Sequence, residues 1–539
     1  MTTVPTGSRA ADSPGENLTG RLDDASRFRI FSVLAVIVLF TEIAPLQYTM
    51  LAASLQKIAP SFADIGANIN WSVIVFGLIA AAGAPLIGKI ADVWGKKRTF
   101  LVCGVLFLIG CLIDATTSSW ALFLVGRCLQ SLAAGSAVCA YGLVRDLMPR
   151  KYVPLSLGVT ATGFGFSALI APILGGWLVD AYQWRAIFWF LAVFTLVMIP
   201  LMAFVVPESK LRVRERIDFA GAVLLGAGVA LVLIYIDKGQ DWGWARPTTL
   251  AWLFVGFALL LAFAVVERRV RVPIMDMRLL VHPKVSMVLL LALFASGLVG
   301  IVPYAMGYMT QVPSADSLRA TIVQGAVDKA HKLTGLNVPA SAIGVHLDPE
   351  FAYGNGFSLF QYAIHIALLS SLTAMIFGAV TGILARRIGA RIPLLVGLVV
   401  VTASGITLAL MPYSWLAFML VGGIFGIGFG MFSASNPILI TEAVPAEQQG
   451  VSTGMLGTAQ GMGNAIGLAV ITAFLNASPV HAKVSFNGNV MANTLIPDVF
   501  GDRGYTLGFV AGTVGAVIAL VIVVFMRHGR TPATGGATH

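Results

Sequence analysis

The 539-residue chain contains little charge: Asp, Glu, Lys and Arg make up only 11% of it, whereas 57% of the residues are hydrophobic. A water-soluble protein of this size could not cover its surface with so few charged side chains. Cysteine is equally scarce. The four cysteines, Cys103, Cys111, Cys128 and Cys139, lie in apolar runs and form no CxxC pair, which argues against a disulfide framework or a thiolate metal site. We therefore expect a membrane protein with no bound metal and no cofactor.

Strand-type alternation of apolar and polar residues is also missing, which disfavours a transmembrane barrel. Instead, the chain contains repeated apolar runs of about 18 to 25 residues, each long enough to cross about 30 Å of hydrocarbon as an α-helix. We predict an all-α integral membrane protein. Its fourteen transmembrane helices are expected at residues 30–51, 70–90, 99–116, 120–144, 155–179, 186–206, 218–237, 248–266, 285–309, 358–384, 392–411, 416–440, 451–475 and 505–526.

The basic residues are unevenly distributed. Most of the 35 Lys and Arg residues fall in the N-terminal region and in alternate loops, and such an excess marks the cytoplasmic side. We expect a multi-pass protein of the cell membrane with both termini cytoplasmic, ending in a disordered tail at residues 1–27 and a second tail at residues 528–539. The net charge of +10 then reflects topology and contact with anionic membrane lipids. It requires no nucleic-acid partner.

Two turns far apart in the chain resemble each other. GKIADVWGKK begins at Gly88 and GILARRIGAR begins at Gly382, and in both a second glycine follows seven positions later. The next turns on the same side also correspond, DLMP at Asp146 with EAVP at Glu442, followed by GVTATGFG and GVSTGMLG. Parallel repeats of this kind are typical of secondary transporters.

These turns carry the residues of a known family. The signature loop between spans two and three of the major facilitator superfamily is matched by Gly88, Asp92, Gly95, Lys96, Lys97 and Arg98, and its fourth-span motif by Arg127 and Gln130. Residues 28–527 resemble the fourteen-span drug:proton antiporter branch of that superfamily. The resemblance implies a major facilitator-type fold. It has two six-helix bundles, at residues 28–206 and 285–527, and two inserted transmembrane helices with cytoplasmic linkers at residues 207–284.

The fifth predicted span contains a row of small residues. Gly163, Ser167, Ala171 and Gly175 are spaced four residues apart, so they share one helix face and allow a neighbouring span to approach closely. The antiporter branch carries glycines and a Gly-Pro pair in this region. They are matched here by Gly158, Pro172, Gly175 and Gly176, with Ser167 and Ala171 in two of the glycine positions. Ordinary helix packing is the alternative interpretation.

The resemblance also implies a gate. Asp92 would hold the cytoplasmic ends of the spans together in the outward-facing state, with nearby bases as partners. The predicted gate consists of Gly88, Asp92, Gly95, Lys96, Lys97, Arg98, Arg386 and Arg387. A simpler interpretation treats these bases as orientation anchors alone, and the two roles are compatible.

Charged side chains inside the membrane are costly unless they are paired or hydrated, so each suggests a function. Glu42 lies mid-span near Pro45, where desolvation would favour its neutral form and permit proton uptake and release. Arg127, which the resemblance implicates in proton transfer, must face the interior or a wet cavity. His365 is a third proton-coupling candidate. Packing, counter-ion and hydrogen-bonding roles are the alternatives for these three, and Asp114 and Asp180 are interpreted as solvated caps.

The other polar residues within spans are candidates for a substrate cavity: Gln47, Gln130, Tyr362, Asn436, Gln460 and Asn464. No nucleophile with a base and no metal-ligand set is found, which disfavours an enzyme. The preferred function is proton-coupled export of hydrophobic or amphipathic organic compounds by alternating access. Export of one dedicated metabolite or lipid is the alternative, and a non-transporting membrane sensor or scaffold is a remote one.

The connection at residues 310–357 is unusually long for this branch. Residues 317–333 place apolar side chains in a helical rhythm, which predicts a short amphipathic helix on the outer face. The insertion has three possible roles: a lid, a docking surface for an outer-face protein or lipid partner, or a tolerated insertion. A second outer loop, at residues 476–504, is also long and is expected to be less ordered.

Overall fold

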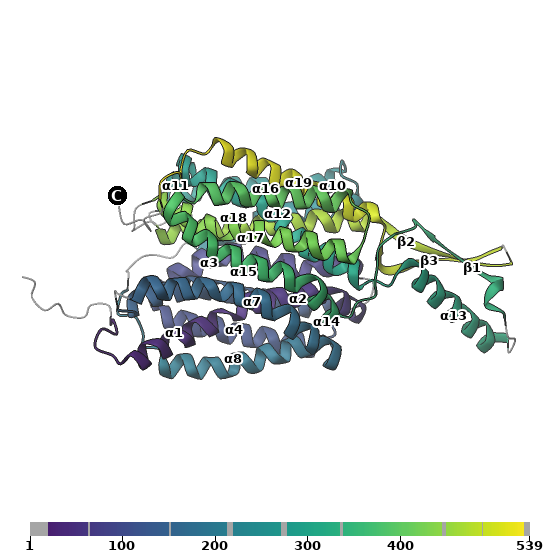
Figure 1. The fold of residues 1–539 in the computed structure, drawn as a ribbon, viewed down its shortest axis with the longest axis horizontal. Coiled ribbons are helices and arrows are strands. Elements are labelled where there is room, and N and C mark those ends of the chain that lie inside the picture. The colour runs from purple at the N-terminus through teal and green to yellow at the C-terminus, as the bar shows by residue number, and fades with distance from the viewer. Residues whose placement is uncertain are drawn as a thin grey trace, which may run out of the picture.

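The computed structural model describes residues 20–62, 65–149, 152–212, 219–270, 277–334, 338–444, 449–487 and 489–532. These residues form a bundle of long helices with a narrow extension at one end (Figure 1). Most of the predicted N-terminal tail and the last residues of the C-terminal tail lie outside the described residues.

Helices account for most of the described chain. The first half contains α1 (Arg27–Thr41), α2 (Ile43–Ile58), α3 (Trp71–Trp94), α4 (Lys96–Thr116), α5 (Trp120–Ser131), α6 (Ser136–Leu147), α7 (Val153–Tyr182) and α8 (Arg185–Val205). The remainder contains α9 (Phe219–Trp242), α10 (Pro247–Glu267), α11 (Met277–Val281), α12 (Pro283–Gln311), α13 (Ala315–Thr334), α14 (Leu359–Tyr362), α15 (Leu368–Ile388), α16 (Arg391–Leu410), α17 (Trp415–Glu442), α18 (Gln449–Asn476) and α19 (Asp502–Phe525). Shorter helical segments are η1 (Ala59–Ser61), η2 (Gly66–Asn70), η3 (Leu132–Gly135), η5 (Ala340–Ala342) and the π-helical turn η6 (Ala363–Ala367).

Each predicted span coincides with a helix or with consecutive helical segments, and the all-α membrane fold is confirmed. Among the described residues, eleven helices are long and apolar enough to cross a membrane, and three shorter apolar stretches lie in η2–α3, α7 and α9. The total of fourteen spans agrees with this count but stays a prediction. The first span differs most from expectation, because it breaks at Glu42 and continues to Ile58.

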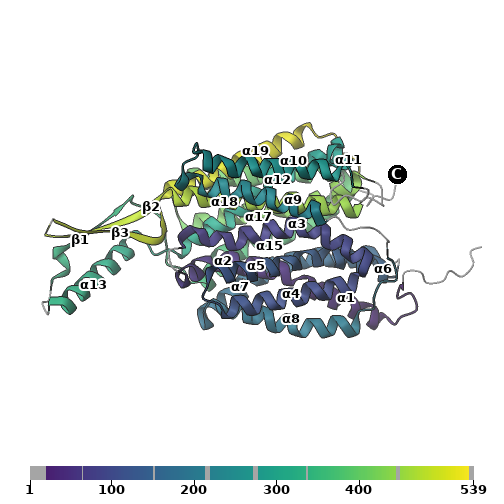
Figure 2. The same ribbon diagram turned by 180° about the vertical axis from the view of Figure 1, so that it is seen from behind.

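The two halves of the chain form two bundles that meet along a seam. Figure 1 shows α1, α4, α7 and α8 (purple to blue) on one side and α16, α17, α18 and α19 (green to yellow) on the other. At the seam, α3 packs on α18, α2 on α12, and α7 on α14 and α15. The beginning of α1 and the end of α19 lie at the same end of the molecule, opposite the extension (Figure 2). The residue limits of the predicted domains stay a prediction.

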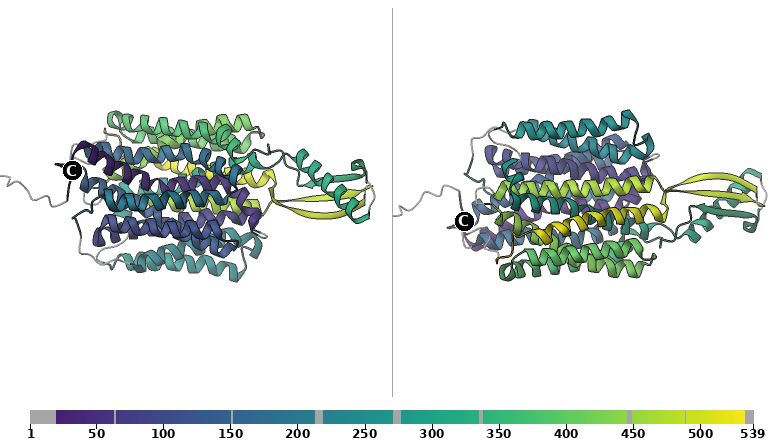
Figure 3. Two further views of the ribbon diagram at one scale, coloured as in Figure 1. Left: turned by 90° about the horizontal axis from the view of Figure 1, so that it is seen from below. Right: turned by 90° about the horizontal axis from the view of Figure 1, so that it is seen from above.

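The inserted helices α9 and α10 lie on one flank of the bundles (Figure 3). They approach each other closely, since a Cβ added to Gly256 would lie 3.0 Å from the carbonyl oxygen of Gly228. Helix α9 also contacts α3 and α18, one helix from each half. On α10, Phe254, Phe257 and Leu261 are exposed. Such an apolar surface suits contact with lipid.

The extension combines two loops that are far apart in the chain. Strand β1 (Ile343–Asp348) pairs antiparallel with β2 (Pro479–Phe486), and β2 pairs antiparallel with β3 (Asn489–Phe500). In this register Ile343 lies opposite Phe486, and Pro479 lies opposite Phe500. The sheet projects beyond the ends of the long helices with α13 beside it (Figures 1 and 2).

Two expectations about the outer loops need correction. The predicted helix is confirmed as α13, but it packs along β1 on the extension instead of lying against the outer ends of the helices. The loop at residues 476–504 is not less ordered, because it forms β2 and β3. Leu347, Val480 and Ala482 are buried. Tyr353 donates a hydrogen bond to the Phe500 carbonyl oxygen at 2.6 Å, so contacts between the two loops hold the sheet together.

Candidate functional site

The turn between α3 and α4 is tied to a third helix, α6. Gly95 has a φ of +126°, which side chains other than glycine rarely adopt. The ammonium group of Lys96 lies 2.8 Å from Asp146 Oδ2 and 3.3 Å from Asp92 Oδ1. Lys96 and Asp146 are both buried. The signature loop therefore links three helices of the first half.

Glu208, which the sequence did not single out, caps the start of α4. Its carboxylate accepts hydrogen bonds from the backbone N–H groups of Lys97 at 2.9 Å and Arg98 at 3.1 Å. The Lys97 ammonium donates to the Ala203 carbonyl oxygen at 2.6 Å. A carboxylate at a helix N-terminus is stabilised by the helix dipole. Lys97 thus has a structural partner in addition to its proposed role in orientation.

Among the described residues, the predicted gate residues form no ion pair across the two halves in this conformation. Asp92 is half exposed, and its ion pair is with Lys96 of the same half. Arg386 and Arg387 are exposed at the end of α15. Gly88 packs on Val138, where an added Cβ would lie 3.0 Å from Cγ1. The gating role of this set stays a prediction.

Polar side chains of the first half meet in a buried network. Arg127 of α5 is fully buried. Its Nη1 donates to Gln130 Oε1 at 2.5 Å, and its Nε donates to the Ser72 carbonyl oxygen at 3.0 Å. The Gln47 amide reaches the same Gln130 oxygen at 2.5 Å, and rotating this amide would turn its oxygen toward Arg127. Gln130 Nε2 donates to Asp114 Oδ2 at 2.9 Å. The network therefore joins residues of α2, α4 and α5 to the backbone of α3.

Asp114 is not the solvated cap that the sequence predicted. It lies two residues before the C-terminal end of α4, yet its exposed fraction is 0%. Helices α4 and α5 approach closely here, because a Cβ added to Gly110 would lie 2.6 Å from the Gly126 carbonyl oxygen. Gly126 leaves the space that the carboxylate occupies. Two features of the sequence could have revealed this burial. Gly110 lies four residues before the acid on α4, and Gly126 lies directly before Arg127 on α5.

Glu42 lies at the one-residue break between α1 and α2 and is buried. The Ser167 hydroxyl of α7 donates to its Oε2. The other carboxylate oxygen, Oε1, has no hydrogen-bond partner among the described residues. The structure therefore connects the acid of the first span to the small-residue row of the fifth.

The small residues of α7 allow it to contact α2 of the first half and α14 of the second half. Ala171 and Pro172 are buried. A Cβ added to Gly175 would lie 3.2 Å from Met50 Cγ of α2, and one added to Gly176 would lie 2.6 Å from Phe360 Cα of α14. Gly158 and Gly163 lie on the same helix. Small residues thus allow α7 to pack tightly on α2 and on the second half.

Hydrogen bonds join the two halves at the end that carries the extension. Asp180, near the end of α7, accepts from the backbone N–H groups of Leu359 at 3.3 Å and Phe360 at 3.0 Å, so it caps α14 instead of facing only solvent. Gln56 donates to the Tyr308 carbonyl oxygen at 2.9 Å. Further pairs across the seam are Asn70 with Thr472, Asn68 with Asn476, and Tyr48 with Asn464. The molecule is closed at this end.

Asp180→Ala is expected to weaken this closure. Loss of a helix cap typically costs about 0.5 to 2 kcal/mol, which corresponds to a roughly 2- to 30-fold loss of the closed form relative to the open form. Spin labels at Tyr182 and Leu410, which are both exposed, would report the separation of the two halves after replacement of the native cysteines. Asp316→Ala, at an exposed acid of the extension, is the control. An unchanged distance distribution would contradict the proposed closure.

The other candidates of the second half are spread over several helices. His365 lies in η6, where its ring stacks on Phe357 with 5.2 Å between centroids and its Nδ1 lies 2.8 Å from the Gln361 carbonyl oxygen. Tyr362 donates to the Pro303 carbonyl oxygen at 3.2 Å. These contacts are local to the second half, so the structure does not bring His365 into the Arg127 network.

The remaining cavity candidates lie on α17 and α18. Asn464 donates to the Tyr48 hydroxyl across the seam, and Gln460 is half-buried on α18. Asn436 is fully buried on α17, and neither atom of its amide has a hydrogen-bond partner among the described residues. Of the predicted set, only Gln47 and Gln130 are joined by a hydrogen bond to each other within the described part of the chain.

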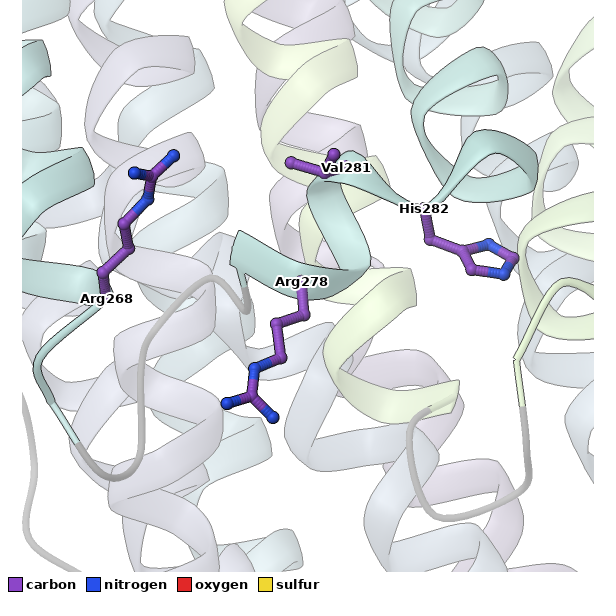
Figure 4. A pocket seen from close by; sticks show the side chains of 4 residues that line it. All are labelled: Arg268, Arg278, Val281 and His282. Carbon is purple, nitrogen blue, oxygen red and sulfur yellow. The ribbon is translucent and has the colours of Figure 1, made fainter.

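A pocket of about 490 Å³ lies apart from the network, between the end of α10 and the start of α12. It is lined by Arg268, Arg278, Val281 and His282 (Figure 4). The polar ends of these side chains point in different directions, so they do not converge on one ligand position. In the described part of the chain, no group of three His, Cys, Asp or Glu residues could hold a metal ion.

The helical bundles and the signature turns identify a family. The family model described as Major Facilitator Superfamily matches residues 35–327 and 333–537. The chain belongs to this superfamily. Its members with similar sequences include the multidrug resistance protein Stp of Mycobacterium tuberculosis, which is 26% identical over 428 residues, 79% of this chain and 72% of Stp.

Two further relatives align with this chain over a smaller share of their own length than Stp does. The probable actinorhodin transporter of Streptomyces coelicolor is 25% identical over 433 residues, 76% of this chain and 66% of that protein. The uncharacterized MFS-type transporter YvkA of Bacillus subtilis is 27% identical over 253 residues, 46% of this chain and 55% of YvkA. Together these relatives identify a transporter and not an enzyme.

Solved structures of other transporters share the fold. A peptide transporter POT in complex with sulfate has a TM-score of 0.58 at 14% identity, covering 91% of this chain and 93% of that chain. A D-xylose-proton symporter has a TM-score of 0.56 at 12% identity, covering 94% of this chain and 99% of that chain. These similarities confirm the predicted major facilitator-type fold.

Proposed function

We propose that this transporter exports hydrophobic or amphipathic organic compounds in exchange for protons. The observation that carries the proposal is Glu42, a carboxyl group buried within the first span at a break in the helix, with one oxygen that has no partner in the described residues. Buried acids in membrane spans commonly serve proton transfer. The similarity to a multidrug resistance protein supports organic compounds as the substrates.

The two bundles provide alternating access. Asp180 and Gln56 bond the halves at the end that carries the extension, whereas the ion pair of Asp92 found at the other end, within the part of the chain that the structure describes, is with Lys96 of its own half. The basic loops favour a cytoplasmic location for the end that holds the chain termini. In this assignment the present conformation is closed to the outside of the cell membrane. Moving one charge across 100 mV supplies about 2.3 kcal/mol for export.

Glu42→Gln is expected to abolish proton-driven export of the compound but to leave its exchange across the membrane intact. In vesicles with an imposed pH gradient, the wild type should move ethidium against its concentration gradient, and the variant should lose this movement because it cannot release a proton. Exchange of ethidium across vesicles without a pH gradient should persist, since it needs no net proton transfer.

Glu350→Gln, at an exposed carboxylate of the extension, serves as the control for Glu42→Gln. Gradient-driven transport at the wild-type rate in the Glu42 variant would reject its role as the proton carrier.

Export of one dedicated metabolite is the second candidate function, and similarity to a probable actinorhodin transporter favours it. Competition assays distinguish the two candidates. A broad exporter should have its ethidium transport inhibited by many unrelated amphipathic compounds, whereas a dedicated exporter should be inhibited by one chemical class.

A further inference from the structure

We propose that Asp114 is a second proton-binding residue of this transporter, coupled to Arg127 through Gln130. The inference rests on the proposed proton-driven export and extends it to a residue outside the first span. It also gives a physical role to a carboxyl group that lies near the outer end of a span and is nevertheless fully buried.

The surroundings of Asp114 are those of a group that changes its charge. Oδ2 accepts a hydrogen bond from Gln130, and Oδ1 has no hydrogen-bond partner among the described residues. A buried carboxyl group with one open oxygen is stable only when its charge is balanced. A bound proton or the approach of a cation can supply that balance.

The charged and titratable groups around Asp114 identify the cation. Arg127 of α5 faces it, together with the thiols of Cys111 and Cys128. On α8, Arg185 is occupied by the Thr117 carbonyl oxygen at 3.0 Å. Arg127 is therefore the cation that is linked to the carboxyl group through a shared partner.

In the present conformation Arg127 is held away from Asp114. The guanidinium group bonds to Gln130 Oε1 and to the Ser72 carbonyl oxygen, and no ion pair joins it to the carboxylate within the described residues. Gln130 is thus a bridge, with Arg127 on its oxygen and Asp114 on its nitrogen. If this bridge opens, Arg127 can pair with Asp114 directly, which displaces a proton from the carboxyl group to water.

The seam supplies a means to open the bridge. Gln47 of α2 contacts Gln130, and the next residue, Tyr48, is bonded to Asn464 of the second half. A compound that enters the seam from the inner end and displaces Tyr48 from Asn464 frees the segment of α2 that carries Gln47. The proton that Asp114 took up from outer water in the outward-open conformation is then displaced by Arg127 and released to inner water.

Two measurements on the full chain test this proposal. The first is ethidium export by vesicles under a pH gradient, and the second is proton release into weakly buffered detergent solution when ethidium binds. Asp114→Asn keeps the shape of the side chain and an acceptor for Gln130. It should lower gradient-driven export by about 5- to 150-fold, the usual range for coupling between sites, and reduce proton release. Asp114→Glu should restore part of both.

The outcomes separate this proposal from the broader one. If wild-type vesicles do not move ethidium under a pH gradient, proton-driven export fails. If the wild type does and Asp114→Asn matches it in export and in proton release, the role of Asp114 is overturned while proton-driven export stands. Should Asp114→Asn not fold, Gln130→Met replaces it, because it removes the bridge and keeps the acid. An unchanged pH profile of ethidium binding in Gln130→Met would then overturn the proposal.

Discussion

Arg127→Met is expected to abolish gradient-driven export and to destabilise the folded transporter. The substitution removes the donors to Gln130 and to the Ser72 carbonyl oxygen and the stacking of the guanidinium group over Phe76, 5.1 Å from the ring centroid. Each lost hydrogen bond from the charged guanidinium group costs about 1.5 to 3 kcal/mol, although Gln130 Oε1 keeps the Gln47 amide as a donor. Asp114 would also lose the nearby positive charge. We expect a loss of export of at least roughly 100-fold, which corresponds to about 2.7 kcal/mol.

Export of ethidium by vesicles and thermal unfolding in detergent measure the two effects of Arg127→Met. Arg127→Lys is informative as well, because a lysine keeps the charge but has no planar fork of donors to span Gln130 and the Ser72 carbonyl. It should restore less than a tenth of the export. Arg319→Met, at an arginine of the extension that forms ion pairs with Asp316 and Glu350, is the matched control. Normal export by Arg127→Met would refute a role for the network in transport.

Asp146→Ala is expected to give the largest loss of stability at the end of the molecule opposite the extension. The variant leaves the buried Lys96 ammonium without its partner at 2.8 Å and removes the acceptor for the Ser209 hydroxyl at 2.7 Å. Breaking a buried ion pair costs about 3 to 5 kcal/mol. The remaining contact with Asp92 at 3.3 Å should keep the loss near the lower limit.

Thermal unfolding and the yield of monodisperse protein measure the effect of Asp146→Ala. Arg145→Ala removes a mostly exposed neighbour whose guanidinium lies 3.5 Å from Asp146, and it should cost less than about 1 kcal/mol. Adding Lys96→Met to Asp146→Ala removes the unpaired charge and should recover most of the stability. If the double variant is no more stable than Asp146→Ala, the explanation by an unpaired buried charge is wrong.

The helices and their approximate limits were predictable from the sequence because each apolar run is long enough to cross a bilayer. The signature turn was equally visible, since Gly95 and the charges at 96–98 are adjacent in the chain. Their partners were not. Asp146 lies on α6 and Glu208 lies in the linker after α8, and no local pattern shows which acid will meet which base.

Asp114 and the extension were misread for the same physical reason. Two residues before the end of α4, an acid normally reaches water, and only the close packing of α4 on α5 at Gly110 and Gly126 buries it. Strand β1 lies in a different loop from β2 and β3, so neither loop alone contains the three-stranded sheet. Both features depend on contacts between segments that are distant in sequence.

The extension also has a use in imaging. Membrane transporters without soluble domains are difficult to align in electron micrographs, because a detergent micelle hides most of their outline. Here β1 to β3 and α13 stand clear of the long helices (Figure 1) and are connected to α12, α18 and α19 of the second half. An antibody fragment raised against the sheet would add mass to that half alone, give each particle a direction, and leave the seam free to open.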